Sequence, residues 1–505
     1  MPTLTLITQT TLLKGLTALL ICLLLPEGNL LAQANPKTTL ESYRQLREQF
    51  TQQLTELQSI GELTSDSPLE KQAHKKREAL VLRSNGVPLL PEELPQQSEE
   101  LNPRLKQLNS FAKEYASGIY LLGQQLEQSH PQLAYQFYQE ALRVEPHHAL
   151  SREKLGYVLS QGRWTTPYQQ RLESLDYIDH PQFGWLKKNE VPRYEKGDRK
   201  YKGRWIEAER EAELRRSFRN AWTIRTEHFL IKTNHSLEAG VELGRQLETF
   251  HTYFREIFLP LYQTPAQLQR MFQANQRVSV STKNLHQVHY FRSRDEYLKT
   301  LKDRVPNIEV TNALYWNDDQ TAYSYYDPER PNFASLFHEA THQLLYESTS
   351  KHRIIAAESN FWVIEGIACY METFRREGDL LTAGNPNDAR VQQTLGQLLQ
   401  DGWHIPIEQF VQFGRVDFQT APLKELQRRY GEAATLSYFF MDAQNGRYRQ
   451  ALIEHIADLY SINQQRRQKA LSLDLLTGQS FEQLDQEYRT FLTATREAVA
   501  TPVQP

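Results

Sequence analysis

Residues 338–342 read His-Glu-Ala-Thr-His, and a further carboxylate follows at Glu365. Side chains four residues apart share one face of a helix, so His338 and His342 can direct two imidazoles at one ion. A carboxylate from a second helix, Glu365, can complete a three-ligand zinc set and leave the fourth position open for water, as a catalytic zinc site requires. Glu339 is next to the first ligand, where it can take a proton from that water.

The residues around this motif have the spacing of a helix with one core face. That face is formed by Phe333, Phe337, Ala340, Thr341 and Leu344. The two histidines lie beside the face rather than within it. The alternative is a buried helix whose histidines are satisfied by neighbouring groups, but the downstream carboxylate favours a metal site.

A second segment, residues 362–372, reads Trp-Val-Ile-Glu-Gly-Ile-Ala-Cys-Tyr-Met-Glu. The two segments together resemble the gluzincin metallopeptidases (peptidase MA-like), whose second helix typically reads Trp-x-x-Glu-Gly-x-Ala-x-Tyr-x-Glu. The resemblance implies His338, His342 and Glu365 as zinc ligands and Glu339 as the general base. It also implies an α+β zincin-like fold with a strand-rich lobe, a zinc helix and a helical C-terminal lobe.

Some roles near the motif remain open. The gap between His342 and Glu365 is slightly longer than in the best-known gluzincins, so Glu358 within that gap is a rival third ligand. Glu372 shares a helical face with Glu365, and the resemblance makes it a candidate for orienting a ligand, although a solvated or salt-bridged carboxylate is an equal alternative. Cys369 on the same helix is expected to be a small buried packing residue rather than a nucleophile.

A phenol donor for the developing oxyanion is expected from the C-terminal half. In the aminopeptidase branch of the gluzincins a tyrosine opens a helix and helps to hold the oxyanion, and Tyr430 precedes Ala433-Ala434 and an apolar run in a similar manner. Tyr438 is a weaker rival. Because the chain has 25 tyrosines, an ordinary core or surface tyrosine is the alternative at both positions.

Length and composition predict a multidomain globular protein. A chain of 505 residues is long enough for roughly two to four domains. The 58 basic and 61 acidic residues give a net charge of −3, which provides no basic field for nucleic acid. An aromatic content of 11% argues against general disorder.

The N-terminus has the pattern of a signal peptide over residues 1–34. Lys14 precedes an apolar run at residues 16–25, and Ala32-Gln33-Ala34 offers a small-x-small cleavage site. The apolar run is too short for a membrane span, so we expect export to the periplasm or the medium, with an uncleaved anchor as the alternative. The mature chain would keep one cysteine, Cys369, and therefore no internal disulfide.

The region after the signal peptide is expected to be helical and repeat-like. Residues 35–105 read as a helix over 38–60 followed by a proline-containing polar linker, and whether this segment acts as a propeptide stays open. Within residues 106–180, the spacing of Ala134, Tyr138, Ala141 and Pro146 resembles the second helix of a tetratricopeptide repeat, and Leu155-Gly156 sits where another repeat would begin. Only one and a half repeats fit, so we favour a helical hairpin packed on the enzyme over an independent array that binds a protein partner.

Residues 181–218 are expected to form a small connecting segment. Aromatic and basic residues alternate from about residue 161, which can indicate nucleic-acid or glycan binding, but interspersed acidic residues favour an irregular subdomain with aromatic packing. Residues 207–218 read as a charged helix.

The metallopeptidase domain is predicted over residues 219–498, with a disordered tail at 499–505. Its first half contains expected strands at 223–233, 277–281 and 288–291, with helices at 236–258 and 294–303. A hairpin is expected from 313–316 and 321–326. In the gluzincins an edge strand beside the zinc pairs with the substrate backbone, and we assign that role to 321–326.

These observations predict an exported, zinc-dependent metallopeptidase that takes a peptide or protein substrate. No run matches the exopeptidase pattern of the gluzincins, which favours an endopeptidase over an aminopeptidase. The competing interpretation is an exported scaffold or protein-binding module with a catalytically inactive zincin domain. Four intact positions, at His338, Glu339, His342 and Glu365, argue for the enzyme, because a structural zinc usually has four protein ligands.

Overall fold

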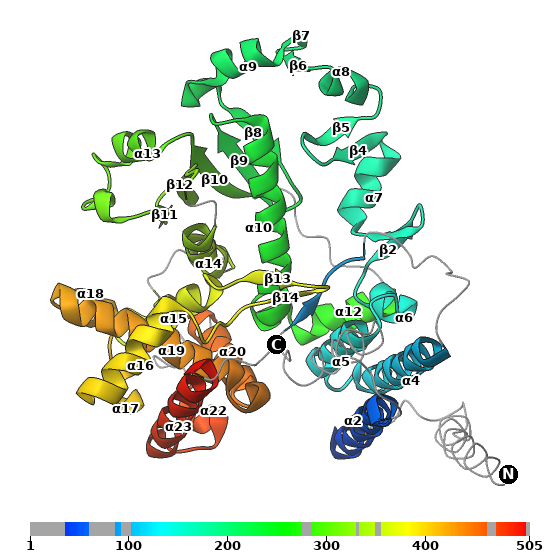
Figure 1. Ribbon diagram of the computed structural model, residues 1–505, viewed down its shortest axis with the longest axis vertical. Coiled ribbons are helices and arrows are strands. Elements are labelled where there is room, and N and C mark those ends of the chain that lie inside the picture. Colours follow the sequence, from blue (N-terminus) through cyan, green and yellow to red (C-terminus); the bar gives the residue numbers. More distant parts are fainter. Residues whose placement is uncertain are drawn as a thin grey trace.

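The computed structural model combines a helical N-terminal region, an arc of β-hairpins, a mixed sheet and a helical C-terminal region (Figure 1). It describes residues 36–59, 86–91, 103–274, 285–329, 333–348, 355–461 and 471–500. The expected signal peptide, the expected strand 277–281, most of the linker and the tail from residue 501 lie outside these residues. The chain combines helices with several sheets, which confirms the predicted α+β class.

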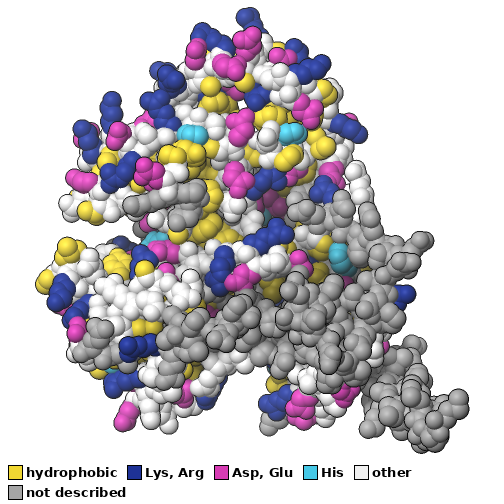
Figure 2. Space-filling model, in the orientation of Figure 1, with side chains coloured by type: hydrophobic (Ala, Val, Ile, Leu, Met, Phe, Trp, Pro, Cys, Tyr) yellow, Lys and Arg dark blue, Asp and Glu magenta, His cyan; other side chains and the backbone are white. Residues whose placement is uncertain are grey.

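The outer surface carries charges of both signs. Figure 2 shows Lys and Arg side chains intermixed with Asp and Glu over the strand-rich part, and hydrophobic side chains gathered in the hollow between that part and the helical C-terminal part. The intermixing agrees with the near-neutral composition of 58 basic and 61 acidic residues. None of the described helices combines the length and the apolar composition that a bilayer crossing demands.

The N-terminal helices pack as a small bundle. Helix α2 (Pro36–Ser59), which confirms the expected first helix, lies on α4 (Pro103–Leu126), and α4 lies on α5 (Pro131–Val144). Their shared core also contains Leu268 and Phe272 of α12 (Pro265–Ala274), a helix from the middle of the chain. The helical region is therefore completed by a helix from the middle of the chain instead of standing alone.

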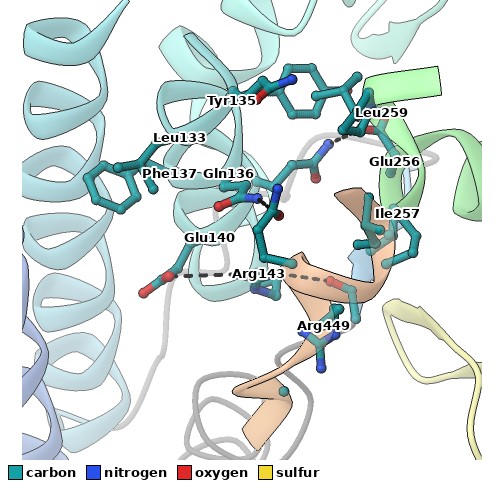
Figure 3. A pocket seen from close by; sticks show the side chains of 18 of the residues that line it. Leu133, Tyr135, Gln136, Phe137, Glu140, Arg143, Glu256, Ile257, Leu259 and Arg449 are labelled. Atoms are coloured by element: carbon teal, nitrogen blue, oxygen red, sulfur yellow. Dashed lines mark hydrogen bonds and ion pairs between the residues drawn. The ribbon is translucent and has the colours of Figure 1, made fainter. Parts of the chain in front are cut away.

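Polar contacts close the seam between the bundle and the rest of the protein. Tyr135 and Gln139 of α5 both donate hydrogen bonds to Glu256, which belongs to α10 (Leu237–Ile257). Figure 3 shows this seam, where Glu140 and Arg143 of α5 face a cavity of about 320 Å³. The face of α5 is thus occupied by intramolecular packing, which agrees with the expectation of a helical hairpin packed on the rest of the chain.

The expected second repeat does not follow this bundle. After α6 (Ala149–Lys154), the chain passes through Leu155 and Gly156 into strand β2 (Val158–Ser160). The prediction that a further helical repeat begins at Leu155-Gly156 is wrong, because Gly156 takes a positive φ of 76° and turns the chain into a hairpin.

Three hairpin-helix units occupy residues 158–215 and form the arc at the top of Figure 1. Each unit is a two-stranded antiparallel sheet followed by a helix. The elements are β2, β3 (Arg163–Thr165), α7 (Pro167–Ser174), β4 (Tyr177–His180), β5 (Gly184–Lys187), α8 (Val191–Glu195), β6 (Asp198–Tyr201), β7 (Arg204–Glu207) and α9 (Ala208–Arg215). The expected boundary at residue 181 falls inside the second unit, whereas the expected charged helix near 207–218 is confirmed as α9.

The sequence marks each unit with a turn glycine and a tryptophan. The turn glycines Gly162, Gly184 and Gly203 have φ values of 79°, 71° and 81°, and a tryptophan follows each one within two residues. Basic side chains stack on the rings, for example Arg193 at 4.3 Å from the ring centroid of Trp205. This arrangement agrees with the expected subdomain of aromatic packing.

A five-stranded mixed sheet lies in the middle part of the chain, in the order β11-β12-β10-β9-β8. The strands are β8 (Trp222–Arg225), β9 (Phe229–Thr233), β10 (His286–Phe291), β11 (Ala313–Trp316) and β12 (Thr321–Tyr325). Strand β10 is parallel to both β9 and β12, whereas β8 and β11 are antiparallel edge strands. The prediction that 321–326 is the edge strand is wrong, because β12 pairs on both sides and β11 is the edge.

Helices cover both faces of this sheet. Helices α10 and α14 (Ala334–Glu347) contact one face, and α13 (Arg294–Leu301) contacts the other. The expected helices at 236–258 and 294–303 are confirmed by α10 and α13. The expected strand 223–233 is instead two strands, β8 and β9, joined by a turn. The hydroxyl of Thr226 stabilises this turn, because it donates a hydrogen bond to the carbonyl oxygen of Phe229 and accepts one from the N–H of Phe229.

A segment of the expected loose linker is a strand. Strand β1 (Val87–Pro88) pairs with β14 (Leu380–Thr382), which pairs with β13 (Arg375–Glu377). The side chain of Arg152 donates a hydrogen bond to the carbonyl oxygen of Leu89 at 2.7 Å. Residues 86–91 therefore connect the helical bundle to the sheet formed by β13 and β14.

The C-terminal region is helical, as expected. Its helices are α15 (Phe361–Met371), α16 (Ala389–Asp401), α17 (Ile407–Phe410), α18 (Arg415–Gln419), α19 (Leu423–Gly446), α20 (Arg449–Tyr460), α22 (Leu473–Thr477) and α23 (Phe481–Ala500). Helix α15 packs between α14 and α19, and every one of its 11 residues is buried. The prediction that Tyr430 opens a helix is wrong, because α19 begins at Leu423.

Candidate metal centre

Helices α14 and α15 bring three predicted ligands to one point. The Nε2 atoms of His338 and His342 are 3.0 Å apart. An Oε2 atom of Glu365 lies 3.5 Å from Nε2 of His338 and 3.6 Å from Nε2 of His342. The rival ligand Glu358 is exposed in the loop before α15 and does not join the cluster.

The geometry around His338 fits a metal ion. Its Nδ1 atom lies 2.7 Å from a carboxylate oxygen of Glu372, which can only accept, so Nδ1 carries the hydrogen and Nε2 presents a lone pair. That lone pair faces Nε2 of His342 at 3.0 Å, and a proton or a cation must lie between two ring nitrogens so close. Two imidazoles and a carboxylate are a zinc donor set, so the residues present fit zinc.

The electrostatics of the centre favour positive charge between the three ligands. Burial alone would lower the pKa of His338, but hydrogen bonds with Cys369, Glu365 and Glu372 raise it well above its ordinary value. Burial alone would raise the pKa of Glu365, but His342 and His338 lower it. A divalent cation would supply the positive charge that this carboxylate and these imidazoles stabilise.

Glu372 can orient the candidate ligand His338 through the ring nitrogen that faces away from the centre, Nδ1. Its second carboxylate oxygen pairs with Arg390 of α16, so the carboxylate bridges a guanidinium and an imidazole. Burial alone would raise the pKa of Glu372, whereas His338 and Arg390 lower it. A carboxylate that receives the outer N–H of a metal-binding histidine fixes its tautomer and ring orientation. Cys369 is buried beside them, as expected for a packing residue.

The candidate base Glu339 is held by the edge strand. The backbone N–H of Tyr315 in β11 donates a hydrogen bond to Oε2 of Glu339 at 2.6 Å. The phenol of Tyr315 donates a second bond to Glu347, one more residue of α14, at 3.1 Å. The backbone of β11 therefore fixes the carboxylate of Glu339, which lines the same cavity as the three candidate ligands.

The ligands and the base open into a cavity of about 580 Å³. Residues from β11, α14, α15, α18, α19 and α20 line it, namely Leu314, Tyr315, Asn317, Asp318, His338, Glu339, His342, Tyr346, Ile355, Ile364, Glu365, Arg415, Tyr430 and Tyr460. The centre therefore has an open side through which a substrate could reach it.

Of the two tyrosine candidates, Tyr430 faces this cavity. Burial and the neighbouring carboxylate of Glu365 raise the pKa of Tyr430, so its phenol stays protonated and can donate a hydrogen bond. Tyr438, two turns later on α19, packs on Phe491 with a centroid distance of 5.1 Å and does not line the cavity.

The cavity residues that the sequence analysis did not assign to the site include Asp318, Arg415 and Tyr460. Each comes from a different element, at the β11–β12 turn, at the start of α18 and at the end of α20. No local pattern marks them, because they meet only when the helical C-terminal region closes against the edge strand.

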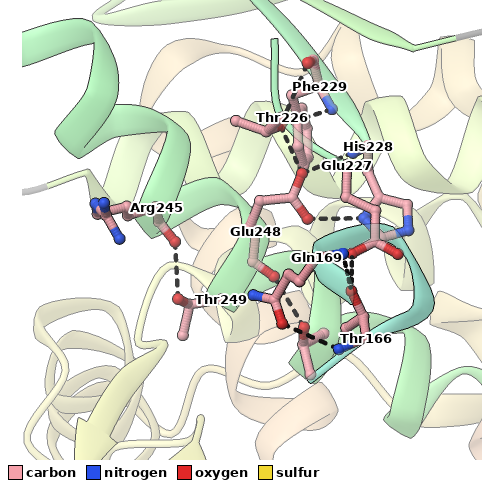
Figure 4. A network of polar contacts seen from close by, with 10 residues as sticks. Thr166, Gln169, Thr226, Glu227, His228, Phe229, Arg245, Glu248 and Thr249 are labelled. Atoms are coloured by element: carbon pink, nitrogen blue, oxygen red, sulfur yellow. Dashed lines mark hydrogen bonds and ion pairs between the residues drawn. The ribbon is translucent and has the colours of Figure 1, made fainter. Parts of the chain in front are cut away.

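A second group of metal-type donors consists of His228, Glu248 and His251. Glu248 accepts hydrogen bonds from Thr226 Oγ1 at 2.5 Å and from the backbone N–H of His228 at 2.7 Å (Figure 4). The other carboxylate oxygen of Glu248 lies 2.7 Å from Nδ1 of His228. Both carboxylate oxygens are thus occupied by protein groups. This geometry fits a hydrogen-bond network that fixes the β8–β9 turn to α10 better than it fits a metal centre.

Comparison with known proteins gives no family assignment: no family model, no curated protein and no solved structure matches the chain. The likeness to gluzincins rests on the residues of α14 and α15 described above.

Proposed function

We propose that the chain is an exported zinc-dependent metallopeptidase with a gluzincin-like zincin fold. The observation that carries the proposal is the convergence of His338, His342 and Glu365 within 3.6 Å, with Glu339 beside them and not among the ligands. Structural zinc sites are usually closed by four protein ligands, whereas catalytic sites have three and an open position. The described residues supply three ligands and a cavity on the open side.

The residues divide the work of peptide hydrolysis. His338, His342 and Glu365 would hold the ion, and a zinc ion there would act as a Lewis acid toward water and the scissile carbonyl. Glu339 takes a proton from the attacking water and delivers it to the leaving amine. Tyr430 donates a hydrogen bond to the carbonyl oxygen as negative charge develops on it.

The edge strand β11 provides the surface for an extended substrate. An edge strand can pair with a peptide backbone through its outward N–H and C=O groups. The N–H of Tyr315 already bonds Glu339, so a substrate would pair with the other outward groups of β11. A second cavity, of about 980 Å³, is lined by Asn312, just before β11, and by Ser335 in the first turn of α14. Cavity space therefore borders both ends of β11, which supports binding of substrate residues on both sides of the scissile bond and hence an endopeptidase.

The competing function is an exported scaffold with an inactive zincin domain. It would use the helical N-terminal region as its binding surface. Against it, α5 is packed on α12 and bonded to Glu256, so part of the helical surface already serves the enzyme.

The test combines metal content with hydrolysis of an unstructured protein substrate. Chelation should abolish cleavage by the wild type, and zinc should restore it. His342→Ala should lose both zinc and cleavage, whereas His130→Ala, which changes an exposed histidine outside the cavity, should keep both. Stoichiometric zinc in His342→Ala would overturn the ligand assignment, and cleavage that survives chelation would overturn the proposed function.

A further inference from the structure

Arg415 is a cation of the cavity that the peptidase mechanism does not use. Its side chain lines the same cavity as the three metal ligands, and its guanidinium stands 4.9 Å from the ring centroid of the buried Phe361. Its Nε atom is buried without a hydrogen-bond partner. Within the described residues, Arg415 has no ion pair.

Six other arginines of the C-terminal part of the chain differ from Arg415 in this respect, whereas the described arginines there that also form no ion pair, Arg376, Arg489 and Arg496, are exposed. Each of the following pairs with a carboxylate: Arg375, Arg390, Arg428, Arg429, Arg447 and Arg449. Four ranges of the proposed metallopeptidase domain, residues 219–498, lie outside the described residues: 275–284, 330–332, 349–354 and 462–470. None of them contains Asp or Glu. This domain therefore leaves the guanidinium of Arg415 without a carboxylate of its own.

The backbone fixes Arg415 in position. Its N–H donates a hydrogen bond to the carbonyl oxygen of Ala357 at 3.0 Å. A Cβ at the preceding Gly414 would come 2.1 Å from that oxygen, so only glycine permits this approach. The start of α18 is thereby joined to the loop that contains Ile355, another residue of the cavity wall.

The charges of the cavity identify what such a guanidinium would bind. A partly buried cation without a partner is costly, and its planar fork matches a carboxylate through two parallel hydrogen bonds. The cavity's own carboxylates include Glu339 and Glu365, which serve as base and ligand, and Asp318, which is exposed on the turn and forms no ion pair with Arg415. The missing partner is therefore a carboxylate that arrives with the substrate.

We propose that Arg415 binds a carboxylate of the substrate, so that the enzyme prefers peptides that place an acidic side chain or a C-terminal carboxylate near the scissile bond. This inference rests on the proposed peptidase function and adds the substrate class to it.

The test uses the full-length zinc-loaded protein and matched peptides. One pair differs only by Glu or Gln at positions next to the cleaved bond, and the other pair differs only by a free or amidated C-terminus. In one of the two pairs, the wild type should cleave the acidic peptide with a kcat/KM roughly 10- to 100-fold above that of the matched neutral peptide. The Glu/Gln pair reports an acidic side chain and the acid/amide pair reports the C-terminus. Equal kcat/KM values in both pairs would overturn the inference and leave the peptidase function standing.

Variants assign the preference to Arg415. Arg415→Gln should lose this preference mainly through a higher KM for the acidic peptide, and Arg415→Lys should keep part of it. The control is Arg428→Gln, since Arg428 also stacks on a ring, that of Trp403 at 5.2 Å, but lies outside the cavity. A preference that persists in Arg415→Gln would contradict the assignment.

Binding gives a readout that does not depend on hydrolysis. In a Glu339→Gln background, fluorescence anisotropy would measure the affinity for the acidic and neutral peptides with Arg415 present or replaced by Gln. The acidic peptide should bind roughly 10- to 100-fold more weakly without Arg415. Equal affinities, or no binding of either peptide, would overturn the inference even if no cleavage is seen in the wild type.

Discussion

Glu372, the residue that ends α15, accepts a hydrogen bond from Nδ1 of His338 at 2.7 Å, so that α15 carries the candidate ligand Glu365 and, at its C-terminal end, the carboxylate that orients the candidate ligand His338. The carboxylate of Glu365 lies near Nε2 of His338. The carboxylate of Glu372, about one helical turn after Cys369, contacts the other ring nitrogen of His338, Nδ1. The position of α15 against α14 therefore controls both parts of the centre.

Replacing Glu372 with Gln should weaken zinc binding without removing a ligand. The amide cannot act as the anionic acceptor for His338, and the ring loses its fixed tautomer, so zinc affinity should fall roughly 10- to 100-fold. Competition with a chelator of known affinity measures the change. Glu425→Gln, which removes a carboxylate paired with Arg429 away from the cavity, should leave the affinity unchanged. Wild-type affinity in Glu372→Gln would contradict the orienting role.

Replacing Tyr430 with Phe should reduce kcat while zinc stays bound. The loss of one donor to the developing oxyanion should lower kcat roughly 100-fold. Tyr438→Phe is the matched control, because Tyr438 lies on the same helix and outside the cavity. Full activity in Tyr430→Phe, measured together with stoichiometric zinc, would exclude this tyrosine as the donor.

Replacing Gly366 with Ala should destabilise the protein. A Cβ at this position would lie 2.4 Å from the carbonyl oxygen of Ala433 and 2.4 Å from Oγ of Ser437, so α15 must move away from α19. We expect a loss of about 1–3 kcal/mol in the free energy of unfolding, measured with denaturant. The control Gly396→Ala, where a Cβ meets nothing within 4 Å, should gain about 0.5–1 kcal/mol. Equal stabilities of the two variants would contradict the packing described.

The stability of the helical C-terminal region should depend on pH through His404. Its Nδ1 atom lies 2.9 Å from Glu432 and its Nε2 atom 3.0 Å from Asp485. Burial alone would lower the pKa of His404, but the bonds to Asp485 and Glu432 raise it from 6.5 to about 9. A folded-state pKa above the unfolded value means that this stabilisation is complete below pH 6.5 and is lost as the pH rises through about 9.

His404→Gln tests this dependence. The difference in unfolding free energy between wild type and variant should be largest near pH 6 and should shrink above pH 9, on either side of the interval set by the two pKa values. His130→Gln, at an exposed position, should follow the wild type throughout. A difference that grows with pH would reverse the sign and contradict a protonated His404.

The sequence allowed the centre to be predicted better than its surroundings. The four-residue spacing of His338 and His342 is a local property of one helix, and the likeness of residues 362–372 to a known pattern placed Glu365. The sheet order was not predictable in this way. Strand β12 becomes internal through parallel pairing with β10, about thirty residues earlier in the chain, and no local pattern distinguishes it from the edge strand β11.

Two features outside the centre were missed for different reasons. The repeated Gly-Arg-Trp at 162–164 and 203–205 is visible in the sequence and would have indicated the hairpin units, but the middle unit has Gly184-Trp185 without an arginine. Strand β1 is two residues long and contains Pro88, so its pairing with β14 depends on tertiary contacts alone.

The most direct test of the central claim compares wild type with Glu339→Gln for zinc content and for cleavage of an unstructured protein. Glu358→Gln, at the exposed loop carboxylate, is the control and should match the wild type in both. We expect all three proteins to bind about one zinc and only Glu339→Gln to fail to cleave. Full activity in Glu339→Gln would contradict the mechanism, and zinc binding without cleavage in the wild type would contradict the peptidase itself.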